Sequence, residues 1–368
     1  MPPHGAVVPH SRPTLDEVDI QAVAEVLRSG RISQGQVTRR FEQAVARFLG
    51  LRDGVATSSG TAALHLALVA LGVGSGDEVI LPSYTCVALL QAVRYVGAVP
   101  KLVDLEPEGY NLSVEEVRQT ITRRTRAVLV PHMFGTPAAI EALCGLGIPV
   151  IEDIAQALGA AVDGRPVGSF GDVAVCSFYA TKVLTTGEGG MVLSDSELLL
   201  RRVRDLRDYD GRRRLRTRFN YKLTDFQAAL GFSQLRRLPE MLDRRRSLAA
   251  RYAERVQVLG LRPPAVRPGS APIYYRYVVS VPDAAKVREA LQAYGVESPP
   301  PVFWPLHRYL SLSGFPRTER AYRTALSLPL YPSLQEEEVD RIFLALEAAL
   351  VAQERTRWRV SSSPSSAR

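Results

Sequence analysis

The sequence lacks any apolar run of the roughly 20 residues that a bilayer-spanning helix needs. The first residues, Met1 to Arg12, also lack the apolar core of a secretory signal peptide. We therefore expect a cytoplasmic protein without a membrane partner. No internal repeat is visible either. A chain of 368 residues is then expected to form one large domain with a smaller one, or two comparable domains.

Cysteine is scarce, with only Cys86, Cys144 and Cys176 in the whole chain. Their spacing matches no metal-binding motif, and an odd number leaves one thiol unpaired in any disulfide scheme. We expect reduced thiols in a reducing compartment and no metal site. All three stand among apolar neighbours in the sequence, which predicts that they pack in the core.

Charge of one sign is only modestly in excess, with a formal net charge of +8. Arginine is concentrated between Arg212 and Arg218 and from Arg244 to Arg246. No nucleic-acid recognition motif accompanies these clusters, so we expect no nucleic-acid partner. An anionic small substrate would also call for arginine, because guanidinium groups bind phosphates and carboxylates through two parallel hydrogen bonds. A solvated surface would need no partner at all.

Short apolar runs alternate with amphipathic segments through the first half of the chain. Runs at 79–81, 99–105, 127–131 and 149–151 have the length of buried strands, and helical segments lie between them. This alternation predicts a mostly parallel sheet with helices on both faces. Ligands bind such sheets at the carboxyl ends of the strands, so functional side chains are expected where strands end.

A single lysine, Lys182, lies in a loop of small residues between two apolar runs, 173–176 and 191–193. A loop lysine is most often a solvated cation. An enclosed site that lowers its pKa would instead let its amine form an imine with a carbonyl. The first carbonyl to consider is the aldehyde of pyridoxal 5′-phosphate (PLP).

The stretch Ser59-Gly60-Thr61 opens a strongly apolar helical segment, 62–71. Backbone N–H groups and the helix dipole at such a start favour an anion, so a phosphate could bind there. An ordinary serine or threonine cap would account for the same residues.

Asp153 and Gln156 follow the apolar run 149–151. In a PLP site an acid must pair with the pyridine nitrogen and keep it protonated, and Asp153 is the candidate. Gln156 would lie on the same side of a helical turn and hydrogen-bond the ring hydroxyl. A carboxylate at this position would serve equally as a cap for the segment that follows.

The second half of the chain is expected to leave the large domain through a helix that starts at Phe226. Pro239 should interrupt it, so that a second helix continues from Leu242 to Leu259. A smaller domain then opens with a strand at 274–281, and His307 is a candidate substrate contact on a surface loop. We expect a large PLP-binding domain at 1–240, a small domain at 241–355 and a disordered tail at 356–368.

Taken in order, these segments and several others resemble the DegT/DnrJ/EryC1/StrS family of sugar aminotransferases. The resemblance runs from about Gly30 to Tyr331; each block alone is weak, and the ordered set is specific. The matching blocks are Ser59-Gly60-Thr61-Ala62-Ala63-Leu64, Gly76-Asp77-Glu78-Val79-Ile80, Gly97-Ala98-Val99-Pro100, Ile151-Glu152-Asp153 with Ala155-Gln156, Gly168-Ser169-Phe170-Gly171-Asp172, Ser177-Phe178 with Lys182, Thr186-Gly187-Glu188-Gly189-Gly190, and Asn220-Tyr221-Lys222.

The resemblance implies an α/β fold of the fold-type I aminotransferase class. It has a large domain with a mostly parallel central sheet covered by helices, and a smaller C-terminal α+β domain. The resemblance also implies PLP as the cofactor and a homodimer with active sites at the subunit interface. By position, Lys182 would hold the PLP aldehyde and carry the proton, Asp153 would pair with the ring nitrogen and Gln156 with the ring hydroxyl. The phosphate would be held by the Ser59-Gly60-Thr61 segment and Ser177, with Asn220 reaching it from the neighbouring subunit.

One position departs from the family pattern. Many relatives have an aromatic residue that stacks on the cofactor ring where this chain has Cys86. A thiol can pack against a ring but covers less area. Tyr84, two residues earlier, would compensate only if the loop turns differently, and it is also a candidate substrate contact.

The leading hypothesis is transamination in two halves. Glutamate, the usual donor in this family, would give its amino group to the cofactor, which would pass it to a keto-sugar linked to a nucleotide. The arginine segment offers partners for a diphosphate. The alternatives are a PLP-dependent sugar dehydratase, whose family members carry histidine in place of the lysine, an aminotransferase for a carbocyclic ketone, and a PLP-binding regulator without turnover.

Overall fold

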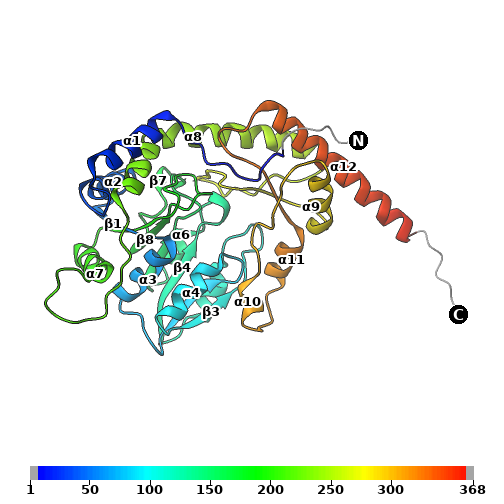
Figure 1. The fold of residues 1–368 in the computed structure, drawn as a ribbon. Coiled ribbons are helices and arrows are strands. Elements are labelled where there is room, and N and C mark those ends of the chain that lie inside the picture. Colours follow the sequence, from blue (N-terminus) through cyan, green and yellow to red (C-terminus); the bar gives the residue numbers. More distant parts are fainter. Residues whose placement is uncertain (1–6, 362–368) are drawn as a thin grey trace.

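The computed structural model describes residues 7–361, with side chains through residue 353. Within this part of the chain the main element is a seven-stranded sheet in the order β1-β9-β8-β5-β4-β2-β3 (Figure 1). Only β9 runs antiparallel to its two neighbours, so the sheet is mostly parallel, as expected. Its strands are β1 (Asp53–Thr57), β2 (Glu78–Pro82), β3 (Val99–Val103), β4 (Thr125–Pro131), β5 (Val150–Asp153), β8 (Val173–Ser177) and β9 (Gly190–Ser194).

Helices cover both faces of this sheet because its strands are apolar on both sides. On β5, Ile151 packs with α3, α4 and α7, and Val150 packs on the opposite face, where α5 and α6 lie. On that opposite face, α2 and the first part of α8 cover the strands nearer β1. The helices are α2 (Gln36–Phe48), α3 (Gly60–Ala70), α4 (Val87–Tyr95), α5 (Val114–Thr120), α6 (Ile140–Cys144), α7 (Glu197–Arg207) and α8 (Asp225–Val258).

A second hydrophobic core brings together the later part of α8 and the C-terminal elements. It contains Tyr252, Tyr277 and Ile342, and also Val8 from the other end of the chain. Val8 joins it through backbone hydrogen bonds with Gly295 and Glu297. The elements of this region are β11 (Tyr277–Ser280), α9 (Ala284–Ala293), α10 (Leu306–Tyr309), α11 (Pro316–Thr324), β12 (Ala325–Leu328) and α12 (Glu336–Ser361).

The remaining elements are small or peripheral. Helix α1 packs along α8, η1 is a single turn after β4, and the short strands β6, β7 and β10 form a three-stranded sheet of their own. Their bounds are α1 (Glu17–Ser29), η1 (Met133–Gly135), β6 (Ala161–Val162), β7 (Arg165–Pro166) and β10 (Ser270–Ala271).

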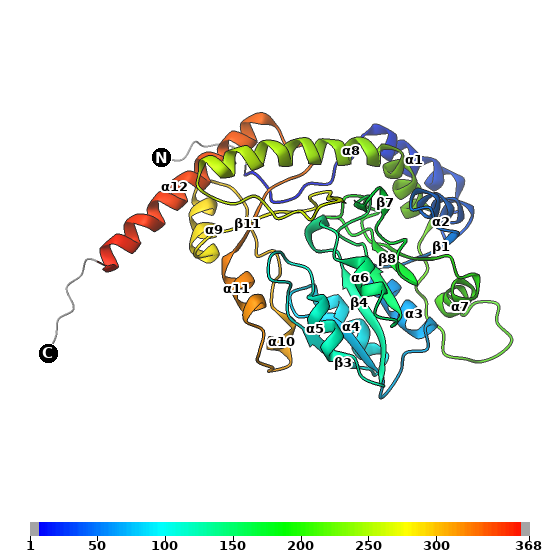
Figure 2. The same cartoon turned by 180° about the vertical axis from the view of Figure 1, so that it is seen from behind.

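The expected break at Pro239 is wrong, because α8 is one continuous helix that contains this proline. Figures 1 and 2 show α8 running along the molecule from α1 and α2 at one end to α9 and α12 at the other. A proline inside a helix costs about 3 kcal/mol. Leu238, Met241 and Leu242, on both sides of Pro239, pack in the same core cluster, and this burial outweighs that cost. We infer that the border between the two domains lies within α8.

The C-terminal prediction is partly wrong. Helix α12 continues to Ser361, so the segment expected to be disordered from residue 356 is helical up to that point. Residues 362–368 lie outside the described part of the chain. No helix between residues 7 and 361 has both the length and the apolar content needed to cross a bilayer.

Candidate active site

The predicted site residues gather at one edge of the main sheet. The strands β1, β2, β5 and β8 end at this edge. Asp153 is the last residue of β5, and the segments that carry Ser59, Cys86 and Lys182 follow the other three strands directly. Side chains alternate between the faces of a strand. Ile151 and Val175 face the helix α3, so Asp153 and Ser177, two residues further along each strand, face the same side.

The start of α3 is built to approach β8 closely. Ser59 caps the helix, and its hydroxyl accepts a hydrogen bond from the N–H of Ala62 at 3.1 Å. A Cβ on Gly60 would lie 2.8 Å from the Cβ of Ser177, so only glycine fits here. The first N–H groups of a helix have no partner within the helix. Those of Gly60 and Thr61, together with the hydroxyl of Ser177, therefore surround a place suited to a phosphate.

Asp153 is the last residue of β5 and is only 8% exposed. One of its carboxylate oxygens accepts a hydrogen bond from the N–H of Ala155 at 2.9 Å. Burial raises the pKa of Asp153, although this N–H and the positive charge of Lys182 act in the opposite direction. A cationic partner, such as a protonated ring nitrogen, would offset the cost of burying this carboxylate.

Lys182 lies on the loop between β8 and β9 and is half-buried. Its backbone N–H donates to the carbonyl of Tyr179 at 2.8 Å, which fixes a turn just before it. Its ammonium nitrogen lies 5.0 Å from the ring centre of Tyr275. Asp153 and Lys182 are close enough to influence each other electrostatically. The structure thus brings an amine and a buried carboxylate together beside the start of α3.

The side-chain amide of Gln156 has a fixed orientation. Its oxygen accepts a hydrogen bond from the N–H of Phe134 at 2.9 Å. Phe134 adopts a left-handed backbone conformation with φ of 59°, which is uncommon for a residue with a large side chain. Since the amide oxygen is engaged, only the NH2 group of Gln156 is left to face a ligand, and Gln156 would act as a hydrogen-bond donor.

Glu152 stands beside Asp153 on β5 but points to the other face of the sheet. It is fully buried, and its carboxylate accepts hydrogen bonds from Nε2 of His132 at 3.0 Å and from the N–H groups of Gly168, Phe170 and Gly171 at 2.7–2.8 Å. Burial alone would raise the pKa of Glu152, but these hydrogen bonds lower it. Glu152 therefore ties the end of β5 to neighbouring loops and takes no part in a ligand pocket.

Cys86 is exposed, so the expectation that all three cysteines pack in the core is wrong for this one. It precedes α4 as the N-cap residue, at the edge where the site lies. Cys176 is buried and Cys144 is half-buried. A loop that follows a strand end is accessible even when its sequence neighbours are apolar, which the sequence pattern did not reveal.

Tyr84 and His307, the two candidate substrate contacts, lie inside the protein. Tyr84 is fully buried and stacks on Tyr110 at a ring distance of 6.0 Å. His307 was expected on a surface loop, but it lies on α10 and is only 4% exposed. Its two ring nitrogens are 2.7 Å from the hydroxyl of Ser83 and 2.8 Å from the carboxylate of Glu319. Both ring nitrogens are therefore engaged, and His307 joins α10 to the segment after β2.

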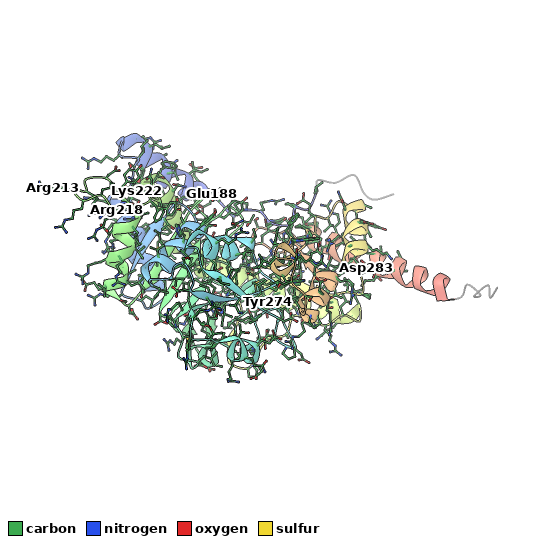
Figure 3. All side chains as sticks on the ribbon, turned by 90° about the horizontal axis from the view of Figure 1, so that it is seen from below. Glu188, Arg213, Arg218, Lys222, Tyr274 and Asp283 are labelled. Carbon is green, nitrogen blue, oxygen red and sulfur yellow. The ribbon has the colours of Figure 1, made fainter. Side chains whose placement is uncertain are left out.

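Asn220 is exposed on the irregular segment that joins α7 to α8. The next residue, Tyr221, accepts a hydrogen bond at its carbonyl from the N–H of Ser58 at 2.8 Å, so this segment touches the loop before α3. Figure 3 shows Arg213, Arg218 and Lys222 at the end of the molecule opposite Asp283, the residue that precedes α9 (Ala284–Ala293). Arg218 is paired with Asp205 at 3.0 Å, whereas residues 211–217 are exposed.

The sequence did not reveal Tyr275, whose ring lies against Lys182, or the two arginines that surround Tyr275. Tyr275 and Arg276 stand just before β11, and Arg245 lies on α8 within the arginine cluster that the sequence did reveal. Arg245 is only 4% exposed, whereas its neighbours Arg244 and Arg246 form surface ion pairs with Glu336 and Asp243. A run of arginines on a helix gives no sign of which one turns inward, because that depends on the elements packed against it.

A model of the DegT/DnrJ/EryC1/StrS aminotransferase family matches residues 13–347 of the chain. The chain belongs to this family. The prediction of the family from ordered motifs is therefore confirmed, and so is the assignment as an aminotransferase. Aminotransferases of this family depend on PLP.

Relatives and solved structures of this family align over most of the chain. The GDP-perosamine synthase of Caulobacter vibrioides is 36% identical over 92% of this chain and 97% of its own length. The UDP-N-acetyl-3-dehydro-alpha-D-glucosamine 3-aminotransferase of Acidithiobacillus ferrooxidans is 34% identical over 93% of this chain and 96% of its own. The crystal structure of DesV from S. venezuelae, in complex with a ketimine intermediate, is 35% identical, covers 90% of this chain and 94% of its own, and has a TM-score of 0.85. This likeness confirms the fold-type I architecture.

Proposed function

We propose that this protein binds PLP and transfers the amino group of glutamate to a nucleotide-linked keto-sugar. The observation that carries the proposal is the meeting of Lys182, the buried carboxylate of Asp153 and the start of α3 at one edge of the sheet. Two of the relatives are named for products or substrates that are nucleotide sugars, one with GDP and one with UDP. The exposed arginines between residues 211 and 217 would suit the diphosphate of such a substrate.

The residues present fit the cofactor at three points. Glycine at position 60 lets the start of α3 lie close to β8, so the first N–H groups of α3 and the hydroxyl of Ser177 would bind the phosphate together. Asp153 would hold a proton on the ring nitrogen, because a buried carboxylate is stabilised by a cationic partner. Gln156 would donate from its NH2 group to the ring hydroxyl.

When bound, PLP supplies an electron sink that weakens a bond to the carbon bearing the amino group. The chain itself would move the proton. The Nζ atom of Lys182 is close enough to the Asp153 carboxylate to interact with it electrostatically, and as a neutral amine it would accept and return a proton at this position.

The proposal is tested with the purified protein, PLP, glutamate and a panel of GDP-, UDP- and TDP-linked keto-sugars. We expect 2-oxoglutarate and an amino-sugar nucleotide to form in equal amounts, as measured by mass spectrometry. Matched carbocyclic ketones should react more slowly. If no keto-sugar of the panel is aminated while a carbocyclic ketone is, the proposed substrate class is wrong.

We further propose a homodimer in which Asn220 of one subunit serves the site of the other. The exposure of Asn220 in the single chain supports this arrangement. Mixed dimers of Lys182→Ala and Asn220→Ala subunits test this arrangement. Each variant alone should be nearly inactive. In the mixed dimer, Lys182 of the Asn220→Ala subunit and Asn220 of the Lys182→Ala subunit would together form one intact site. Recovery of activity is expected on mixing. No recovery from two inactive parents would mean that Asn220 serves the site of its own subunit.

A further inference from the structure

Three cationic side chains lie around Tyr275. Lys182 and Arg276 lie over its ring, at 5.0 and 5.7 Å from the ring centre, and Arg245 is close enough to influence it electrostatically. The hydroxyl of Thr181 is 3.2 Å from the hydroxyl of Tyr275. Tyr275 itself is 7% exposed, so this concentration of positive charge is largely shielded from water.

Arg245 is buried without an acidic partner among the described residues. Its Nη1 atom donates to the backbone carbonyls of Leu330, Tyr274 and Tyr275 at 3.0–3.4 Å, and its Nε atom is buried without a hydrogen bond. Burial lowers the pKa of Arg245 to about 10, so the guanidinium remains charged at neutral pH. A buried charge that meets only neutral dipoles is stabilised when an anion joins it.

Arg276, just before β11, also has a buried nitrogen atom without a partner in the part of the chain that the structure describes. Its Nη1 atom is buried and has no hydrogen bond among the described residues. The nearby imidazole of His10 provides no negative charge. Burial, together with the charges of Arg276 and Arg245, lowers the pKa of His10 to about 3, so that its ring is neutral.

These groups line one small cavity next to Lys182. The cavity is lined by His10, Ser11, Thr181, Arg245, Tyr275, Arg276, Leu328 and Leu330. Its volume is about 10 Å³, which is about the room that one water molecule needs. A phosphate, with three or four oxygens and a tetrahedral shape, would not fit. One oxygen of a planar carboxylate would fit and would meet the unpaired N–H groups of both arginines.

We propose that this cavity, the Tyr275 pocket, binds the α-carboxylate of the amino donor. The proposal rests on the proposed transamination and adds the donor subsite to it. The α-carboxylate is bonded to the same carbon as the amino group, so it must lie close to the amine that handles the proton. The Tyr275 pocket meets this condition because Thr181 precedes Lys182 in the chain and Tyr275 lies against its ammonium group.

The direct test measures binding of glutarate, which has the carboxylates of glutamate but no amino group to transfer. Calorimetric titration of the purified protein with glutarate should show binding that falls roughly 10- to 100-fold in Arg276→Met, the range expected when a charged hydrogen-bond partner is lost. Arg276→Lys should recover part of the affinity. Inorganic phosphate should not compete with glutarate at this pocket.

The matched control is Arg244→Met, on the same helix as Arg245 but paired with Glu336 at the surface. It should bind glutarate as the wild type does. Arg245→Met serves as a second test variant, and its circular dichroism spectrum is compared with that of the wild type because Arg245 also holds three backbone carbonyls. Unchanged glutarate affinity in a folded Arg276→Met protein would overturn the proposal.

Steady-state kinetics separate the α-carboxylate from the side-chain carboxylate. In Arg276→Met we expect KM to rise by the same factor for glutamate and for alanine, while the KM for the keto-sugar stays unchanged. A rise for glutamate alone would place the side-chain carboxylate in the pocket and overturn the assignment. If wild-type protein binds glutarate but transfers no amino group, the proposed function fails and the carboxylate pocket remains.

Discussion

Arg207 and Arg245 are both buried, but the chain neutralises only one of them. Arg207, 7% exposed, donates to the carboxylate of Glu42 at 2.7 Å and to the carbonyl of Ala56 at 2.8 Å. Arg245, 4% exposed, meets carbonyl oxygens alone. Each leaves its Nε atom without a hydrogen bond, so the carboxylate is what distinguishes them.

The difference separates a structural charge from one that awaits a ligand. Arg207 joins α7 to α2 and β1, and the carboxylate of Glu42 completes its environment. Arg245 lies beside Tyr275, where an internal carboxylate would occupy the place of a substrate. Leaving this charge uncompensated reduces the stability of the free protein and favours binding of an anion.

The largest effect on stability is expected from Glu42→Ala. It leaves Arg207 buried without its carboxylate, which typically costs about 3–5 kcal/mol of unfolding free energy. Urea denaturation measures the loss. Arg245→Met should cost clearly less, because it removes an uncompensated charge together with its carbonyl contacts. Equal losses for the two variants would show that the two arginines do not differ in the way described.

A smaller effect concerns the pH dependence of Tyr275. Burial raises its pKa, but Lys182, Arg276 and Arg245 and the hydroxyl of Thr181 lower it more, to about 8. Since an exposed tyrosine has a pKa of about 10, ionisation stabilises the folded protein as pH rises from about 8 to 10, and this contribution is absent below pH 8. The tyrosinate would also neutralise the pocket, so the KM for glutamate should rise above pH 8.

Tyr275→Phe provides the comparison for this titration. The difference in ultraviolet absorbance between wild type and variant should show one of the 14 tyrosines ionising near pH 8. The variant should also lose the rise in KM above that pH. If every tyrosine ionised only at pH 10 or higher, Lys182, Arg276 and Arg245 would not lower the pKa of Tyr275 as described.

The smallest effect is expected from Arg244→Met, which calibrates the comparison. Arg244 lies next to Arg245 on α8, but its side chain is 39% exposed and its partner Glu336 is 3.7 Å away. Exposed ion pairs contribute up to about 1 kcal/mol. We expect a change in unfolding free energy below this value and an unchanged KM for glutamate. If Arg244→Met lost as much unfolding free energy as Glu42→Ala, Arg244 would not be the weakly paired surface residue described here.

The sequence predicted the features that depend on local patterns. Strand and helix alternation gave the sheet, and a glycine and hydroxyl residues at a helix start marked the Gly60 region. Lys182 and Asp153 were found because each follows an apolar run. These signals involve neighbours in the chain, and the ordered family motifs reinforced them.

What the sequence did not reveal depends on contacts between distant segments. Arg245 is buried because the backbone after β10 and before α12 packs around it. Pro239 is tolerated because the residues around it share one core. His307 is held by Ser83, 224 positions away in the chain. None of these contacts produces a repeating pattern in the sequence. The roles of Arg245 and Arg276 in the Tyr275 pocket could therefore not be predicted.

The most direct test of the central claim is the location of the covalent bond to the cofactor. The chain has only four lysines, Lys101, Lys182, Lys222 and Lys286, so a labelled peptide identifies its residue without ambiguity. The protein is incubated with PLP, reduced with borohydride, digested and analysed by mass spectrometry. We predict the mass of the reduced cofactor on Lys182 alone. The label on another lysine, or on none, would contradict the account.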